Sequence, residues 1–493
     1  MRNRGRKAIQ PVLRALSALL VSTLIFAAAA TADDSGWTMT EVIPRGAALP
    51  GGGSLTEVGT VYSLKDGAYA FWAKSGDKHW GLYLANGAGV SRLLVERTDL
   101  KLDGVPDSVS VQYQPGGLYI PTEMVFSNDV LYLETRRGRG NPAVLAVTAG
   151  GLTKILARGD TAPYPEGAVV ASTKPLAADG GRLLLHYSTE KPKPGNHWAI
   201  WDGTSSRHVL SAGDEVLPGT RVRALYGSRW YMTRAVPTLV GDHIVADLEV
   251  EGGSYPRAIF DIGPGGARKL LAVGEVLPDN AARKIQGFTS VAAAGPDRFL
   301  VQLDSVGEGF MSLEVSSFYL YDHGKLRRVM TWKELNAELG SLEHVTWSAH
   351  FLGDLTILQI HPRPKVEGGS FFAVQDHFYL VDLETTKKVE ASGGCCGHKA
   401  ARRLATPSGS EGLIGGTRVV GYRWLDAKAP ERMQEPPAIS TDKGEVSLGD
   451  VAAWLGTDKG VVVREGSLYL IERAAAGQPA APATNVELYW QLY

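Results

Sequence analysis

The chain of 493 residues is poor in cysteine, in net charge and in long apolar segments, and each shortage excludes a class of protein. Two cysteines cannot build the disulfide framework of a small secreted domain. With 51 basic and 52 acidic residues, the chain lacks the basic excess of a nucleic-acid binder. After residue 32, no apolar run reaches the roughly 20 residues of a transmembrane helix. The 58 glycines and 26 prolines stay below the share typical of low-complexity disorder, so the composition indicates a folded protein.

The familiar catalytic motifs are also missing. The 11 histidines form no HExxH pair, and there is no GxSxG elbow, phosphate loop or dinucleotide fingerprint. The sequence therefore leaves both the cofactor and the reaction unknown.

The N-terminus has the pattern of a signal peptide. Five basic residues and no acidic residue precede the uncharged apolar run 15–30, and Ala30-Thr31-Ala32 supplies the small residues of a cleavage site. We therefore expect residues 1–32 to be removed and residues 33–493 to be exported, to the periplasm or the medium. The remaining 461 residues carry a formal net charge of −6.

A short pattern recurs through the chain, in which a few apolar residues are followed by Gly, often by an acidic residue, and then by Pro. Its copies, some of them degenerate, are 42–46, 93–98, 155–160, 209–214, 270–275, 329–334 and 388–393. Measured at the position that Gly46 holds in the first copy (46, 98, 159, 213, 274, 333 and 393), the spacings are 52, 61, 54, 61, 59 and 60 residues. A fixed period of this kind predicts a repeat architecture.

Each interval carries two strand signals rich in β-branched and aromatic residues. The predicted strand pairs are 68–72 with 81–84, 130–133 with 143–147, 183–186 with 199–201, 244–246 with 258–260, 299–301 with 318–320, 355–358 with 378–380, and 461–463 with 468–470. A small sheet cannot bury both faces alone, so such units must stack on one another. We predict an all-β fold, a single β-propeller over 33–493 with seven blades, six or eight being alternatives. The runner-up is two packed β-sandwich domains.

Several local features refine this prediction. Residues 37–46 lack preceding strands of their own and could complete the last blade, although 485–493 compete for the same edge. Thr331 with Glu334 predicts a short helix that ends at Gly340, and Ser447 predicts a second one over 448–455. Residues 425–446, which contain three prolines, are expected to form a long loop insertion.

The tandem Gly-Asp/Glu pattern with its following Pro, in a chain expected to be exported, resembles a group of bacterial secreted β-propeller repeat proteins. The resemblance covers most of residues 37–394. It implies a propeller fold and export, and it implies no activity, because none is assigned to that group.

The only two cysteines, Cys395 and Cys396, are adjacent and lie between glycines, with His398 nearby. Neighbouring Cα atoms are about 3.8 Å apart, below the usual disulfide range, so a bond between them would be strained and easily reduced. The alternatives are free or intermolecularly linked thiols, and a soft metal site formed by Cys395, Cys396 and His398.

In several units, aromatic residues recur on or near the strand that is expected to lie nearest the propeller axis. They could pack between blades, or they could form a platform at the mouth of the central channel for a carbohydrate, peptide or protein ligand. The candidate ligand-binding residues are Tyr113, Tyr226, Arg229, Trp230, Phe288, Trp347 and His350. The acidic residues of the repeat, Asp160, Asp214, Glu275 and Glu334, are expected to close turns by accepting backbone N–H groups rather than to hold cations.

These features favour an exported binding or interaction module that does not span a membrane after signal removal and binds no nucleic acid. One alternative is a propeller hydrolase or lyase that acts on a carbohydrate or envelope polymer. The other is a redox or metal-handling protein that uses the 395–398 loop.

Overall fold

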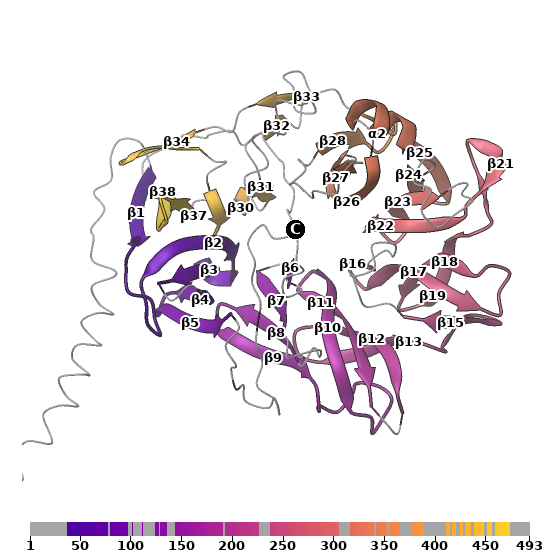
Figure 1. The fold of residues 1–493 in the computed structure, drawn as a ribbon, viewed down its shortest axis with the longest axis horizontal. Coiled ribbons are helices and arrows are strands. Elements are labelled where there is room, and N and C mark those ends of the chain that lie inside the picture. Colours follow the sequence, from indigo (N-terminus) through magenta and orange to yellow (C-terminus); the bar gives the residue numbers. More distant parts are fainter. Residues whose placement is uncertain are drawn as a thin grey trace, which may run out of the picture. The chain divides into compact units, whose positions relative to one another are not determined.

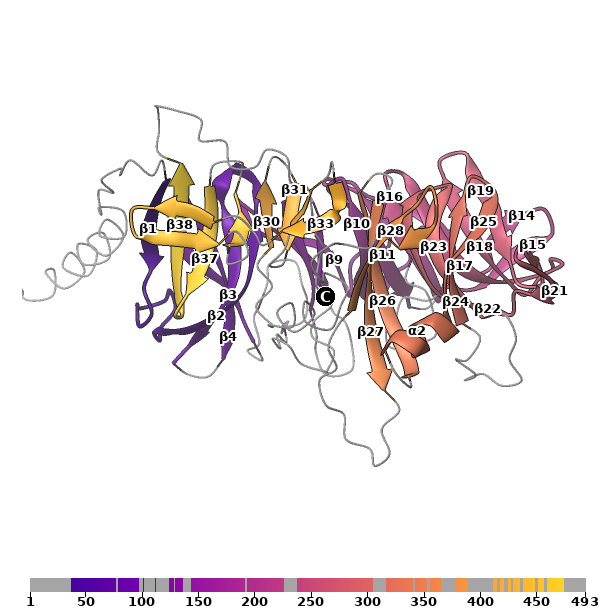
Figure 2. The same cartoon turned by 90° about the horizontal axis from the view of Figure 1, so that it is seen from above.

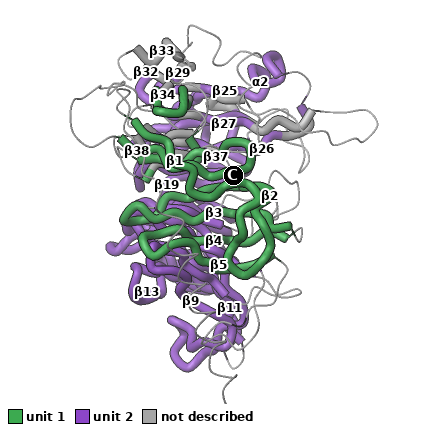
Figure 3. Tube along the Cα trace, turned by 90° about the vertical axis from the view of Figure 1, so that its left-hand side faces the viewer, with its two compact units in different colours: residues 1–96, 408–422, 436–484 green, residues 97–407, 423–435, 485–493 purple. Residues whose placement is uncertain are grey.

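In the computed structural model, the chain forms successive antiparallel sheets (Figure 1). The structure describes residues 37–76, 79–96, 101, 111, 124–127, 129–135, 143–190, 193–225, 237–304, 316–339, 342–352, 355–364, 377–388, 411–414, 417–420, 424–426, 429–434, 438–447, 451–455 and 459–473. The chain divides into two compact units, shown in Figure 3. Unit 1 comprises residues 1–96, 408–422 and 436–484, and unit 2 comprises residues 97–407, 423–435 and 485–493.

Unit 1 contains two four-stranded sheets, which we name blades 1 and 7. Blade 1 consists of β2 (Leu55–Ser63), β3 (Tyr69–Ser75), β4 (Trp80–Asn86) and β5 (Gly89–Val95), with a 3-10 turn at Lys65–Gly67. Blade 7 consists of β36 (Val451–Trp454), β37 (Lys459–Arg464), β38 (Ser467–Arg473) and the N-terminal β1 (Trp37–Ile43). The prediction that 37–46 could complete the last blade is therefore confirmed, since β1 pairs antiparallel with β38. Residues 485–493 lie outside the described residues.

Unit 2 contains blades 2 to 6. Blade 2 consists of β6 (Met124–Ser127), β7 (Val130–Glu134), β8 (Ala143–Thr148) and β9 (Gly151–Ala157), and blade 3 of β10 (Val170–Asp179), β11 (Arg182–Thr189), β12 (Gly195–Trp201) and β13 (Ser206–Ser211). Blade 4 has β16 (Thr238–Val240), β17 (His243–Glu251), β18 (Arg257–Gly263) and β19 (Gly266–Ala272), extended by β14 (Glu215–Leu217) and β15 (Thr220–Ala224). Blade 5 consists of β22 (Gly287–Gly295), β23 (Arg298–Asp304), β24 (Ser316–Asp322) and β25 (Lys325–Thr331), and blade 6 of β26 (Leu342–Leu352), β27 (Leu355–Pro364), β28 (His377–Asp382) and β29 (Lys387–Lys388).

The described residues thus form seven sheets of four or more strands, and the fold is a β-propeller. Within unit 2, the first strand of each blade lies beside the first strand of the next blade. The neighbouring pairs are β6 and β10, β10 and β16, β16 and β22, and β22 and β26. All fourteen strand segments predicted from the sequence lie in strands, except that Ala68 precedes β3 by one residue. The two-sandwich alternative is wrong, because the strands of each unit-2 blade pair with their neighbours in the chain instead of with a second sheet.

Four short hairpins accompany the blades: β20 (Val276–Leu277) with β21 (Asn280–Lys284), β30 (Glu411–Ile414) with β31 (Thr417–Val420), β32 (Trp424–Asp426) with β33 (Ala429–Gln434), and β34 (Ala438–Thr441) with β35 (Gly444–Ser447). The last two lie in the segment expected to be a loop insertion. The helix predicted from Thr331 is confirmed as α2 (Trp332–Leu339), which directly follows β25 in the chain and is labelled in Figure 2. The helix predicted over 448–455 is wrong, since residues 451–454 form β36. A helix this short is marginal by itself, and pairing with β37 satisfies the same backbone groups while burying Ala453.

The recurring apolar segment is the outer strand of a blade, and it carries a β-bulge. In blades 1 to 5 one residue of that strand has no opposite partner, which bends the strand locally. The unopposed residues are Leu93, Ile155, Val209, Leu270 and Val329. A structural feature shared by blades 1 to 5 thus explains part of the repeat.

The glycine of the repeat begins the connector to the next blade. In the four complete copies, Gly46, Gly159, Gly213 and Gly274 have φ values of 85°, 88°, 95° and 93°, a region that favours glycine. Each donates its N–H to a buried residue at the far end of the connector, at 2.7–2.8 Å. The acceptors are the carbonyls of Leu55, Val170, Val222 and Ile285.

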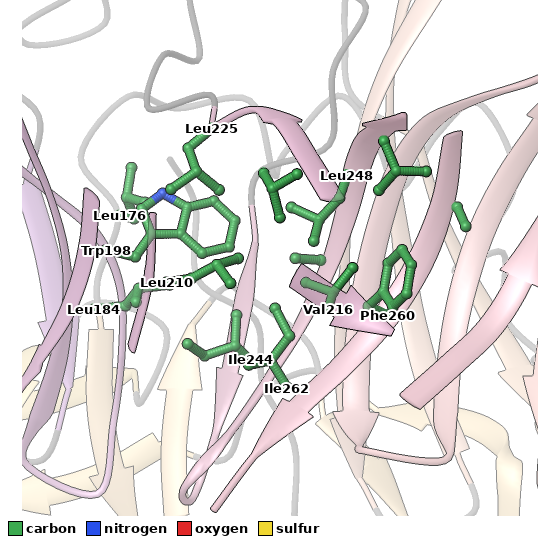
Figure 4. Close-up of a cluster of buried hydrophobic side chains, with 14 of the residues drawn as sticks. Leu176, Leu184, Trp198, Leu210, Val216, Leu225, Ile244, Leu248, Phe260 and Ile262 are labelled. Carbon is green, nitrogen blue, oxygen red and sulfur yellow. The ribbon is translucent and has the colours of Figure 1, made fainter. Parts of the chain in front are cut away.

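The blades bury their faces against each other. Figure 4 shows the core between blades 3 and 4 of unit 2, where Trp198 and Leu184 face Ile244 and Phe260. Val216, from the connector, fills the same cluster and is 7% exposed. Each connector therefore contributes to the core as well as joining two blades.

Candidate binding site on the connector between blades 2 and 3

Residues 159–170, which we call the blade 2–3 connector, form a compact and internally bonded loop. Gly159 N–H donates to the Val170 carbonyl at 2.8 Å, and Val170 N–H returns a bond to the Asp160 carbonyl at 2.9 Å. One Asp160 carboxylate oxygen accepts the Ala157 N–H at 2.8 Å, and the other lies 2.8 Å from the Lys154 ammonium. The turn-closing role predicted for Asp160 is thus confirmed.

The same role is confirmed for two other acidic residues of the repeat. Asp214 accepts the Ser211 N–H at 2.7 Å, and Glu334 accepts the Thr331 N–H at 2.6 Å in a capping box. Glu275 instead pairs with Lys269 at 2.6 Å.

The tip of the connector presents an aromatic ring to solvent. Tyr164 is 42% exposed, although its backbone is tied down. The Tyr164 carbonyl accepts a hydrogen bond from the Tyr187 hydroxyl at 3.0 Å. Two residues later in the chain, the Glu166 carbonyl accepts one from the Lys193 ammonium at 3.1 Å. Val169, on the same connector, is also exposed, at 37%. The exposed ring is therefore held in one place before any ligand arrives.

Two imidazoles lie beneath Tyr164. The Tyr164 ring covers His208, with centroids 4.1 Å apart and planes inclined by 30°. It meets His197 edge-on at 5.8 Å, and the Tyr187 ring stacks on His197 at 5.1 Å. Because His208 covers one face of Tyr164, the exposed surface of this ring is its opposite face and its edge.

Both imidazoles bond to one buried hydroxyl. Ser211 Oγ lies 2.7 Å from His197 Nδ1 and 2.8 Å from His208 Nε2. On its far side, His197 Nε2 lies 3.1 Å from the Thr189 hydroxyl, which donates its only hydrogen to the Lys193 carbonyl at 2.6 Å. We call His197, His208 and Ser211 the imidazole–serine cluster.

These contacts fix the direction of every hydrogen bond in the cluster. Since the Thr189 hydrogen is committed, Thr189 Oγ1 must accept from His197 Nε2–H. A neutral His197 then has a free lone pair at Nδ1, which accepts the Ser211 O–H. Ser211 Oγ in turn accepts from His208 Nε2–H.

Burial keeps both rings neutral near pH 7. It lowers the pKa of His197 to about 4, with a smaller contribution from the nearby His208 in the same direction. Burial likewise lowers the pKa of His208, while the Asp214 carboxylate, 4.0 Å from His208 Nε2, acts against it. On β11 burial also lowers the pKa of His186, to about 3.

Two of the ligand-binding residues predicted from the sequence have described side chains, and both pack within unit 2. Phe288 is 1% exposed and lies under the Arg257 guanidinium, 5.7 Å from its ring centroid. Trp347 is half-buried; it donates its indole N–H to Gln302 at 3.0 Å and meets Phe318 edge-on. His350 belongs to β26, and its side chain is outside the described part. Tyr113, Tyr226, Arg229, Trp230, Cys395, Cys396 and His398 also lie outside the described residues.

Sequence reasoning missed the imidazole–serine cluster, although one signal was available. A two-residue turn at Asp202-Gly203 would place position 197 opposite 208 in a hairpin. The turn instead has four residues, with Trp201 opposite Ser206, and the bulge at Val209 shifts the register by one further position. His197 therefore faces Ser211, and the side chain of His208 reaches the same hydroxyl. The distant Tyr164 gave no such signal.

Within the described ranges, no three His, Cys, Asp or Glu side chains are grouped so that they could hold a metal ion. In the same part of the chain, no helix combines the length and apolar character needed to cross a bilayer.

No protein-family model and no curated protein matches the chain. Among solved structures, the acylaminoacyl peptidase of Pyrococcus horikoshii matches at 14% identity and a TM-score of 0.28, over 65% of this chain and 53% of the peptidase. The β-propeller domain of the Trilobed protease from Pyrococcus furiosus matches at 13% identity and a TM-score of 0.26, over 56% and 84%. The N-terminal domain of Nup159 matches at 10% identity and a TM-score of 0.31, over 90% and 97%.

The chain thus spans about half the length of the peptidase it matches. At identities and TM-scores this low, the likenesses carry over no activity, substrate or partner to this chain.

Proposed function

We propose that the protein is an exported binding module that holds a saccharide against the exposed face of Tyr164. The observation that supports this is a solvent-exposed aromatic ring whose backbone and inner face are both fixed. A tyrosine offers a large contact area with few rotatable bonds, so little entropy is lost when a ligand stacks on it. Pre-organisation of this kind raises affinity by lowering the cost of binding.

The groups around the connector suit a ligand rich in hydroxyls. Arg158 and Glu190 lie 3.5 Å apart, with side chains 54% and 48% exposed. The Glu190 N–H donates to the carbonyl of Val169, which brings this pair to the end of the connector. A guanidinium and a carboxylate supply planar donors and acceptors for neighbouring hydroxyls, while the apolar face of a sugar ring covers the tyrosine.

A glycan array probed with the purified protein tests the proposal, with affinities then measured by calorimetry on the glycans it selects. We expect Tyr164→Ala to lower the affinity at least about tenfold, and Tyr164→Trp to retain it. The matched control is Val276→Ala, which removes an exposed side chain (51%) from the equivalent connector between blades 4 and 5. Equal affinity of Tyr164→Ala and wild type would refute the site, and binding to a peptide array alone would refute the saccharide.

Export is a separate part of the proposal and rests on the pattern of residues 1–32. N-terminal sequencing of the protein recovered from the periplasm or medium should begin at Asp33. Recovery of the intact chain from the cytoplasm would contradict it.

A further inference from the structure

The imidazole–serine cluster has the hydrogen-bonding capacity for one added proton and not for two. With both rings neutral, each hydrogen has an acceptor, in the order His208 to Ser211 to His197 to Thr189. A proton added at His208 Nδ1 disturbs none of these bonds. A proton added at His197 Nδ1 is also accommodated. His197 Nδ1–H then donates to Ser211 Oγ, and the Ser211 O–H turns to donate to His208 Nε2, provided that His208 carries its own hydrogen on Nδ1.

A second proton leaves no satisfactory arrangement. Both rings then point an N–H at Ser211 Oγ, and the Ser211 hydrogen has no acceptor among them. Ser211 is 4% exposed and His197 is 4% exposed, so water does not readily supply one. A buried, unsatisfied hydroxyl and two adjacent cations are each costly. The rings therefore titrate as a coupled pair.

The two rings that share Ser211 are also the rings that support Tyr164. His208 covers its inner face, His197 meets its edge, and Tyr187 joins His197 to the Tyr164 carbonyl. We infer that the cluster is an acid-operated latch, which holds the blade 2–3 connector closed with no proton or one and releases it when both rings are charged. The closing and opening do not depend on the proposed function; only their consequence, release of a saccharide in acid, rests on it.

The other titratable or charged groups around the pair come from each neighbouring element. They are Lys174 on β10, His186 and Tyr187 on β11, Tyr164 on the connector, Lys193 before β12, and Asp214 after β13. The Asp214 carboxylate raises the pKa of both rings, and His197 lowers the pKa of His186.

Hydrogen exchange of the connector amides tests the latch without any ligand. Ala162 N–H donates to the Ala168 carbonyl, and Ala168 N–H donates to the Pro165 carbonyl, so both report closure. The amides of Val222 and Ile285 occupy the equivalent connectors and serve as internal controls. Between pH 7 and about pH 3.5, we expect protection of the first two amides to fall at least about tenfold more than that of the controls.

Two non-titrating variants make the test specific. In His197→Asn, the amide oxygen can accept the hydrogen bond that Ser211 donates. In His208→Gln, the amide N–H can donate a hydrogen bond to Ser211. Neither amide takes up a proton in this pH range. The latch requires both charges, so each single variant should keep the connector protected in acid. Acid opening that persists in either variant, or that occurs in all connectors together, would overturn the inference. Since no saccharide is present, this result stands or falls separately from the binding proposal.

Discussion

Replacement of His197 by asparagine should change how stability depends on pH. In the unfolded chain this imidazole takes up a proton near pH 6.5, whereas burial in the folded protein lowers its pKa to about 4. The unfolded state therefore binds more protons between these values, and the free energy of unfolding falls as the pH drops through that window. At about 1.4 kcal/mol per pH unit, the loss due to His197 between pH 7 and pH 5 is about 2 kcal/mol.

Urea unfolding followed by tryptophan fluorescence at pH 7, 6 and 5 measures this loss. At pH 7, His197→Asn should have a lower free energy of unfolding than wild type, because it loses the stacked ring. At pH 5 this difference in free energy of unfolding should be smaller by about 2 kcal/mol, because only wild type loses stability through His197. The control is His323→Asn, at a side chain 76% exposed and a φ of 47°, which asparagine tolerates. A gap that stays constant from pH 7 to pH 5 would refute the argument that burial disfavours the imidazolium.

Two further predictions concern the fold, each read from urea midpoints. Gly274→Ala should cost roughly 1–2 kcal/mol, because its φ of 93° is unfavourable for alanine although a Cβ would meet nothing within 4 Å. Gly265→Ala, in equally open space and outside the left-handed region, should cost less than about 0.5 kcal/mol, and equal costs would contradict the backbone explanation. Asp247→Ala should cost about 3 kcal/mol, because it removes the carboxylate that the half-buried Arg257 contacts through Nε, at 2.8 and 2.9 Å, and through Nη2; a neutral result would show that water replaces these contacts.

The propeller could be predicted because its information is local and repeated. Runs such as Leu183–Leu185 and Ala258–Phe260 are apolar, short and bounded by turn residues, which is typical of strands buried on both faces, and both are buried strands. The outer-strand motif recurs because blades 1 to 5 share the same bulge and four connectors begin with the same positive-φ glycine. Where only a short apolar stretch was available, as at 448–455, tertiary pairing decided between helix and strand.

The candidate binding site could not be predicted in the same way, because its parts come from three separate places in the sequence. Tyr164 belongs to a connector, Thr189 ends β11, and His197 and Ser211 face each other only because a bulge shifts the register. The burial that lowers the pKa of His197 is a property of the packed blade, and neither spacing nor composition records it.

The lengths of the connectors suggest why the exposed ring occurs where it does. From the glycine to the residue whose carbonyl it reaches, the connectors after Gly46 and Gly213 advance 9 positions, and those after Gly159 and Gly274 advance 11. The ends are constrained in both classes, since the glycine needs a positive φ and the last residue is buried. Only the tip can vary without cost to the core. The two additional positions lengthen the tip, and in the connector after Gly159 the longer tip carries the solvent-facing Tyr164 on a fixed base. A rigid scaffold with variable tips is the arrangement on which binding residues commonly lie.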